Sequence, residues 1–247
     1  MRRLLEIRGV FVHSSRGNRL NDINLSISSG ERVALVGSNG SGKSSLLAVA
    51  NGTLIPDSGK VLWQNCSTSN LGQRQRRKIG TLWQDLRLVE ELNVAQNINS
   101  GALANRNLLW ALANLLKPIE LNACSECLKK VGLSTSILSA MVSELSGGQR
   151  QRVAIARLLR QKPELILADE PLFSLDPILA KEILHLFLDN TMTSDMDEER
   201  TLLMSLHQPS FFRHFDRVIA LKSGRVVFDQ PADCLDEEAL ALIYGSA

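Results

Sequence analysis

An eight-residue stretch near the N-terminus constrains the fold of this chain more than any other. Residues 37–44 read GSNGSGKS, which fits G-x-x-x-x-G-K-[ST]; the apolar segment RVALV precedes them and a helix-like run, SLLAVANG, follows. Between a strand and a helix, such a loop lets backbone N–H groups close around phosphate oxygens. The alternative is a plain glycine-rich turn, which requires neither this spacing nor these flanks. We therefore expect an α/β domain that binds nucleotide phosphates.

The loop also predicts the cation contacts of a triphosphate. The Lys43 ammonium would neutralise the β- and γ-phosphate oxygens, and the Ser44 hydroxyl would ligate Mg²⁺. The loop residues that we expect to contact the nucleotide are Gly37, Ser38, Asn39, Gly40, Ser41, Gly42, Lys43, Ser44 and Ser45.

A second segment, LILADE at residues 165–170, supplies acids for the same chemistry. Four apolar residues predict a buried strand, and ligands of open parallel sheets bind at the carboxyl ends of the strands. Asp169 would hold Mg²⁺ through water, and Glu170 would accept a proton from the attacking water. Two acids after an apolar run are commonplace alone. Together with the phosphate loop they predict a P-loop ATPase with ATP and Mg²⁺ as cofactors.

A third segment, LSGGQRQR at residues 145–152, opens a strongly helical run. Ser146 and Gln149 have the S-x-x-Q spacing of a capping box. Gly147 and Gly148 carry no side chains, so first-turn N–H groups could approach an anion at the positive end of the helix dipole. The alternative is a well-formed N-cap with no ligand, and the segment alone does not decide between the two.

In this order, the three segments resemble those of the ABC-type ATPases, and the resemblance covers essentially the whole chain. LSGGQ is the signature of that family. Gln84 in LWQDL resembles the Q-loop glutamine, Asp176 in SLD the D-loop aspartate, and His207 in SLHQ the switch histidine. The resemblance implies that Gln84 contacts Mg²⁺ or the attacking water and that His207 contacts the γ-phosphate. It therefore implies four catalytic residues: Glu170, His207, Gln84 and Lys43.

The resemblance also implies a head-to-tail dimer of two copies. In this family the signature helix of one copy closes over the γ-phosphate held by the phosphate loop of the other. The residues expected to contact ATP in trans are Ser146, Gly147, Gly148, Gln149 and Asp176. The metal contacts implied are Ser44, Gln84 and, via water, Asp169. His13 falls where family members often place an adenine-stacking tyrosine, with Phe11 nearby, and either ring could stack on the base.

Alternating strand-like and helix-like segments predict a mostly parallel sheet covered by helices. Residues 1–36 read as short strands between polar turns, whereas residues from Val89 to about Lys130 show helical spacing of Leu and Ala. We expect one ABC-type nucleotide-binding domain over 1–247. Its parts would be a RecA-like core (about 1–85 and 163–247) with antiparallel N-terminal strands, and a helical subdomain (about 86–162).

Composition excludes several other functions. The net charge of +2 gives no reason to expect a nucleic-acid partner, and the basic run QRQRRK at 73–78 is typical of a solvated surface. LLWALANLL at 108–116 is about half as long as a membrane span. A core face is its first interpretation and a partner-docking face the second. CSEC at 124–127 has no second pair to complete a zinc site, so we expect free thiols.

Length places the chain among the ATPases that drive importers. About a hundred residues separate the phosphate loop from the signature, too few for the coiled coils of chromosome-maintenance relatives. LADEPLFSLDP, VIALKSGRVVFD and ALIYG are similar to segments of phosphonate importer ATPases. This resemblance implies an ATP-hydrolysing subunit for import of a phosphonate or related phosphorus oxyanion, on the cytoplasmic face of the inner membrane. It also implies two permease subunits and an extracytoplasmic binding protein as partners.

Two alternatives stay open at this point. An importer ATPase for another small solute would carry the same nucleotide motifs. So would a non-transport ABC ATPase that transmits force to a membrane complex.

Overall fold

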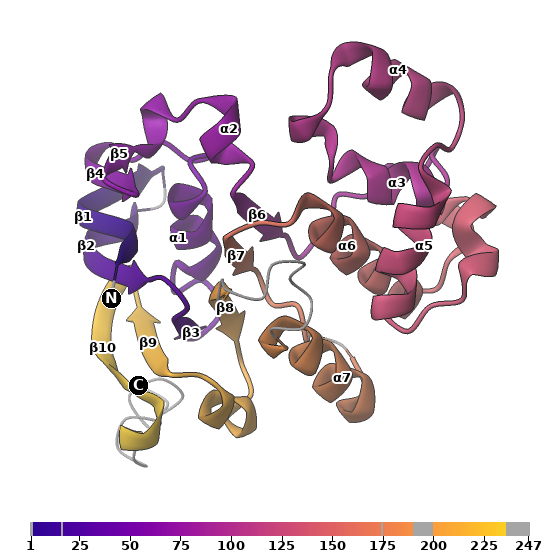
Figure 1. Cartoon of the computed structure of the whole chain (residues 1–247). Coiled ribbons are helices and arrows are strands. Elements are labelled where there is room, and N and C mark those ends of the chain that lie inside the picture. Colours follow the sequence, from indigo (N-terminus) through magenta and orange to yellow (C-terminus); the bar gives the residue numbers. More distant parts are fainter. Residues whose placement is uncertain (1, 16, 174, 190–199, 236–247) are drawn as a thin grey trace.

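The computed structural model describes residues 2–15, 17–173, 175–189 and 200–235. Within these ranges the chain forms two sheets, and a group of helices lies to one side of them (Figure 1). The ALIYG segment lies outside the described residues, as does Ser174 of the SLD segment.

The first sheet is antiparallel and has the strand order β2-β1-β4-β5. Its strands are β1 (Arg3–Ser14), β2 (Gly17–Ser28), β4 (Ser58–Trp63) and β5 (Cys66–Ser67). This sheet confirms the antiparallel strands predicted for the N-terminus. It carries the start of β2 close to the phosphate loop, because the Asn21 N–H donates to the carbonyl of Gly224 and the Gly224 N–H donates to that of Ser41.

The second sheet has the order β10-β9-β3-β8-β7-β6, and its neighbouring strands are parallel except for the hairpin of β9 and β10. Its strands are β3 (Arg32–Val36), β6 (Ile79–Leu82), β7 (Leu165–Ala168), β8 (Thr201–Leu206), β9 (Arg217–Lys222) and β10 (Arg225–Pro231). Strands β7 and β8 are buried throughout and β3 is buried except at Arg32, as expected for parallel strands covered on both faces. The mostly parallel core sheet predicted from the sequence is therefore confirmed.

The central sheet separates two apolar cores. Alternate residues of a strand point to opposite faces, so Val33 and Leu35 of β3 join one core and Ala34 and Val36 join the other. Helix α1 (Lys43–Ala50) and the antiparallel sheet fill the first core. Helices α3 (Val94–Ser100), α5 (Leu121–Lys130), α6 (Gly147–Gln161) and α7 (Pro177–Leu188) contribute to the second.

The helical segment between β6 and β7 forms a lobe beside the core, with α4 (Leu108–Leu116) at its outer end (Figure 1). The helical character predicted for this segment is confirmed. One expectation within it is wrong, since the leucines of LLWALANLL do not form a core face: Leu109 and Leu116 are 76% and 85% exposed. The polar Asn114 is buried instead and faces the lobe.

The basic run lies on the surface, as predicted, in and after the short helix α2 (Gln73–Arg76). The two cysteines of CSEC lie on α5, and Cys124 is fully buried. No group of three metal-ligating side chains gathers anywhere in the described ranges. Nor does any helix of those ranges have the length and apolarity to cross a bilayer.

Candidate nucleotide site

The phosphate loop connects β3 to α1 and bends sharply to do so. Gly37 and Gly42 have φ values of 149° and 110°. A Cβ at Gly37 would lie 2.3 Å from the Leu221 carbonyl oxygen, and one at Gly42 would lie 2.7 Å from that of Arg19. Only glycine fits such backbone angles at such close approach, so the sequence motif is also a packing requirement.

Lys43, the first residue of α1, points back into the loop. Its Nζ donates to the carbonyl oxygens of Gly37 and Ser38 at 3.0 and 3.3 Å, although the side chain is only 4% exposed. The buried hydroxyl of Ser41 has no hydrogen-bond partner among the described residues. A buried ammonium held by neutral carbonyls, beside an unpaired hydroxyl, forms a cradle suited to an oxyanion.

A cavity of about 410 Å³ opens beside this cradle. The phosphate loop, the segment after β6 and the segment after β7 all line it. Its lining residues are Arg19, Asn39, Gly40, Gly42, Lys43, Ser44, Ser45, Gln84, Glu170 and Phe173. The structure thus brings Gln84 and Glu170 to the loop residues predicted from the motif.

Two acids follow β7, as the LILADE pattern predicted. Asp169 is buried and its Oδ1 accepts from the Ser205 hydroxyl at 2.9 Å, while the Glu170 N–H donates to the same hydroxyl at 2.7 Å. Ser205 therefore ties both acids to the neighbouring strand β8. The φ of Glu170 is 49°, a left-handed conformation that costs a non-glycine residue about 1–3 kcal/mol.

The Glu170 carboxylate lies between the His207 imidazole and the Lys43 ammonium. Its Oε1 is 2.6 Å from Nε2 of His207 and 3.5 Å from Nζ of Lys43. His207 follows β8, so three separate strands deliver these three side chains to one point. A carboxylate held in this way is aimed at the cradle and is placed to accept a proton there.

The signature segment starts α6 with the predicted capping box. The Gln149 N–H donates to Oγ of Ser146 at 3.3 Å, and the Ser146 N–H donates to Oε1 of Gln149 at 2.9 Å. A Cβ at Gly147 would meet nothing within 4 Å. None of the signature residues lines the cavity at the phosphate loop of the same chain.

Asp176 caps the next helix, α7. Its Oδ1 accepts from the N–H groups of Ile178 and Leu179 at 3.1 and 3.0 Å. The signature lies close to α7, because a Cβ at Gly148 would lie 3.4 Å from the side chain of Leu179 in the first turn of that helix.

His13 lies near the end of β1, and its side chain contacts the neighbouring strand β2. Its Nδ1 is 2.6 Å from Oδ1 of Asn18, and its N–H donates to Asp57. Neither His13 nor Phe11 lines the cavity at the loop, so stacking on adenine stays a prediction.

Sequence reasoning missed three residues of this site. Arg19 and Phe173 line the cavity, and Ser205 holds both acids. A hydroxyl within the buried run TLLMSL was a signal for Ser205, since a buried polar group needs a partner. Phe173 had a weaker sequence signal, an apolar residue three positions after Glu170; in the structure it is 57% exposed. Arg19 lies in β2, within a polar stretch that reads as a turn in the sequence, and no sequence signal pointed to it.

Comparison with known proteins agrees with this geometry. Residues 20–173 match the family model described as ABC transporter. The phosphonates import ATP-binding protein PhnC of Maricaulis maris is 37% identical, over 92% of this chain and 87% of that protein. The phosphonates import ATP-binding protein PhnC 1 of a Nostoc species is 39% identical over the same shares.

A solved structure supports the same assignment. An ATP-binding cassette, determined as a dimer in a post-hydrolysis state bound to ADP and Pi, superposes with a TM-score of 0.79. It is 29% identical, over 93% of this chain and 99% of that one. The chain described here belongs to the ABC transporter family, in the group of ATP-binding proteins that includes those of phosphonate import.

Proposed function

We propose that this protein is the ATP-hydrolysing subunit of an importer for a phosphonate or a related phosphorus oxyanion. The observation that carries the proposal is the convergence of Lys43 and His207 on one carboxylate oxygen of Glu170 beside the phosphate loop. ABC-type relatives use ATP hydrolysis to power transport. The relatives named above are phosphonate import proteins, and they are the reason for proposing a phosphonate as the solute.

The phosphate loop residues and Lys43 bind the triphosphate in this proposal. The Lys43 ammonium now donates to two neutral carbonyls, and phosphate oxygens would be better acceptors for a buried cation. The unpaired Ser41 hydroxyl supports an oxyanion ligand at the same place.

The residues at the site also fit Mg²⁺, a cation that prefers oxygen ligands and keeps several waters. Ser44 and Gln84 line the cavity, and the buried Asp169 carboxylate follows directly after β7. These three would hold the ion, with Asp169 acting through water. When bound, Mg²⁺ neutralises charge on the phosphate oxygens.

Glu170 acts as the general base in this mechanism. Its carboxylate is fixed by His207 on one side and by its own constrained backbone on the other. It accepts a proton from the attacking water, which Gln84 helps to position. His207 then lies close enough to contact the γ-phosphate, and most of the rate comes from positioning and charge stabilisation.

Two copies would complete each site. The signature residues Ser146–Gln149 form a capped helix start and do not line the loop cavity of their own chain. A head-to-tail dimer would bring them to the partner's γ-phosphate, with Asp176 at the interface. The similar cassette was determined as a dimer, which supports the association of two copies.

The transported solute does not touch this subunit in the proposed assembly. The chain would act at the cytoplasmic face of the inner membrane, where its helical lobe grips cytoplasmic helices of two permease subunits. An extracytoplasmic binding protein would select the solute. Closure of the ATP-bound dimer would then reorient the permease.

An uptake experiment tests this function directly. We expect cells that lack the gene to lose uptake of labelled phosphonate or phosphite, and the wild-type chain to restore it. Lys43→Ala should not restore it, because the triphosphate loses its principal cation. Unchanged uptake in the deletion strain, with no redundant system present, would remove the phosphonate assignment and leave the ATPase to be matched to another solute or membrane complex.

A further inference from the structure

The hydroxyl of Ser205 is shared by the two acids of the nucleotide site. Ser205 is fully buried on β8, and its hydroxyl donates to Oδ1 of Asp169 at 2.9 Å. The same oxygen accepts from the backbone N–H of Glu170 at 2.7 Å. A hydroxyl has a single hydrogen to donate. Because that hydrogen goes to Asp169, the lone pairs of the oxygen remain for Glu170, and both bonds form at once.

The bond to Glu170 lies where the ladder between β7 and β8 ends. The last pair in register is Ala168 with Met204, and Ser205 is the next residue along β8. Beyond this pair the backbone turns away from the sheet, since the φ of Glu170 is 49°. An N–H that leaves a ladder inside the protein needs another acceptor. The Ser205 side chain is that acceptor, and it stabilises the turn that aims Glu170 at the phosphate loop.

Strand β8 therefore contacts Glu170 at two points. Ser205 holds the backbone N–H, and His207, two residues later, places Nε2 at 2.6 Å from the carboxylate Oε1. The position of the carboxylate depends on both contacts, because a shift of the backbone would move the side chain away from His207.

The bond to Asp169 orients the other acid. Its carboxylate is buried, and the Ser205 hydroxyl restricts its rotation by bonding Oδ1. Hydrogen-bond partners behind a metal-holding carboxylate set its orientation, and their loss typically lowers metal affinity or activity by about 10–100-fold.

We propose that Ser205 is a positioning residue that couples the carboxylate holding Mg²⁺ to the general base. It lines no part of the phosphate-loop cavity, so it acts through Asp169 and Glu170 rather than on the nucleotide. This inference rests on the roles proposed for those two acids. A single hydroxyl fixes the carboxylate of the first and the backbone of the second, so the two acids keep one relative position.

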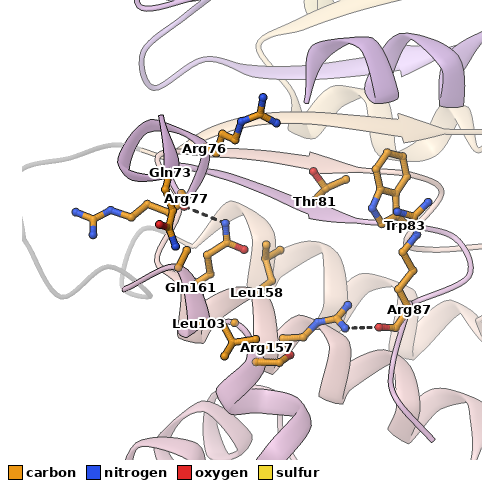
Figure 2. Close-up of a pocket in the computed structure, with 13 residues that line it drawn as sticks. Gln73, Arg76, Arg77, Thr81, Trp83, Arg87, Leu103, Arg157, Leu158 and Gln161 are labelled. Carbon is orange, nitrogen blue, oxygen red and sulfur yellow. Dashed lines mark hydrogen bonds between the residues drawn. The ribbon is translucent and has the colours of Figure 1, made fainter. Parts of the chain in front are cut away.

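Two other hydroxyls of the core sheet offer matched controls for Ser205→Ala, which removes the hydroxyl alone. Thr201→Val replaces a fully buried hydroxyl of the same strand, which accepts from the Gly30 N–H at 3.0 Å. Thr81→Val replaces a hydroxyl of β6, which accepts from the Asn51 amide at 2.8 Å. Thr81 lines a separate cavity (Figure 2). Ser205→Thr keeps the hydroxyl and is the rescue variant.

The first test needs neither nucleotide nor metal. It measures amide hydrogen exchange residue by residue, by NMR, in the full chain. We expect the Glu170 N–H to exchange about five- to tenfold faster in Ser205→Ala, the factor that one hydrogen bond contributes. Exchange at Glu170 should stay at the wild-type rate in Ser205→Thr and in both controls. An unchanged rate at Glu170 in Ser205→Ala would overturn the proposal.

The second test measures steady-state ATP hydrolysis at varied ATP and Mg²⁺. For Ser205→Ala we expect kcat to fall about 10–100-fold and the Mg²⁺ concentration for half-maximal activity to rise. The KM for ATP should hold, because the phosphate loop is intact. Ser205→Thr should recover most of the lost kcat, and both controls should keep the wild-type Mg²⁺ dependence. A merely structural defect would reduce the amount of active protein without changing that dependence, and this result would refute the positioning role.

Combination with Glu170→Gln tests whether Ser205 acts through the base. Added to Glu170→Gln, Ser205→Ala should lower hydrolysis much less than it does in the wild type, because the group that it positions is already lost. Fully additive losses would refute action through Glu170. If Ser205→Ala does not fold, Ser205→Cys replaces it in all three measurements, since a thiol is close in size and a weak hydrogen-bonding group.

The results also separate this inference from the proposed function. If Glu170→Gln alone hydrolyses ATP like the wild type, the proposed base fails, and the positioning role fails with it. If Glu170→Gln is inactive while Ser205→Ala keeps the wild-type kcat and Mg²⁺ dependence, the positioning role is refuted and the proposed base stands.

Discussion

Glu170 combines a strained backbone with contacts to three neighbours. Its φ of 49° aims the side chain away from β7, toward His207 and Lys43, and Ser205 holds its N–H in that geometry. Backbone strain of this kind persists only where the surrounding structure fixes it, and it concentrates at functional sites. The proposed base is therefore a residue whose position depends on three strands at once.

Replacing Glu170 by Gln should separate ATP binding from ATP hydrolysis. Glutamine preserves size and a hydrogen bond to His207 but cannot accept a proton, so we expect hydrolysis to fall by roughly 10²–10⁴-fold. ATP binding and the ATP-dependent dimer should persist, as measured by size-exclusion chromatography with Mg²⁺ and ATP. Glu126→Gln, an exposed site on α5, is the matched control. A variant that binds ATP and stays monomeric would contradict the shared-site model.

The cysteines should differ sharply in reactivity. Burial raises the pKa of Cys124 to about 12, and it also raises the pKa of Cys127. The thiolate is the reactive form, so at about pH 8 iodoacetamide should modify the exposed Cys66 first and leave Cys124 intact until the protein unfolds. Mass spectrometry of the labelled peptides measures this order.

The same pKa shift has a defined effect on stability. In the folded protein the pKa of the Cys124 thiol lies above its ordinary value of 9.0. The contribution of this thiol to the free energy of unfolding is therefore fully present below pH 9.0 and is lost as the pH rises toward 12. Labelling of Cys124 as fast as Cys66 in the native protein would show that α5 opens readily.

At the scale of elements, helix α3 packs against α6 through a glycine. A Cβ at Gly101, just after α3, would lie 2.1 Å from the carbonyl oxygen of Arg157 in α6. The contact is backbone to backbone, so no side chain can move aside to relieve it. The packing of α3 against α6 within the helical lobe therefore requires glycine at this position.

We expect Gly101→Ala to destabilise the protein by about 1–3 kcal/mol, the usual cost of overpacking. Equilibrium urea unfolding would measure the loss as a lower midpoint. Gly147→Ala is the matched control, because a Cβ on that helical glycine would meet nothing within 4 Å and alanine favours helix. Equal midpoints for the Gly101 variant and the wild type would show that the two helices can separate without cost.

The leucine segment is the element for which sequence and structure disagree most. LLWALANLL is apolar nearly all round, so its composition favoured a core face. Asn114 decided the orientation, because its amide finds Gln96 and Asn99 inside the lobe and would lose those bonds outside. The second interpretation, a partner-docking face, stays a prediction.

At the scale of the whole molecule, the proposed dimer makes each site from two chains. A Lys43→Ala chain retains its signature, and a Gly148→Asp chain retains its phosphate loop. Each variant alone should be inactive: the first lacks its phosphate-binding cation, and in the second like charge at the helix start would repel the γ-phosphate. Mixed together, they should regain hydrolysis, because one site of a mixed dimer combines both intact halves.

The readout is phosphate release as a function of mixing ratio. A chain that carries both substitutions supplies no intact half and is the control. If the mixture is as inactive as its components, the head-to-tail arrangement is refuted.

The spacing of residues in the sequence was sufficient to predict those parts of the site that lie within a single segment. The phosphate loop, the capping box of Ser146 and Gln149, and the acids after β7 all follow from residues a few positions apart. Their backbone hydrogen bonds and steric limits are set within the segment itself, so the pattern determines the geometry.

Tertiary structure alone decided which distant residues meet. Ser205 holds both acids and His207 reaches Glu170, because β7 and β8 are neighbours in the core sheet. Arg19 comes to the cavity from β2 of the other sheet, and Phe173 from the segment after β7. The same holds for the outward leucines of α4. Such contacts depend on packing between elements far apart in the chain, and no local spacing encodes that packing.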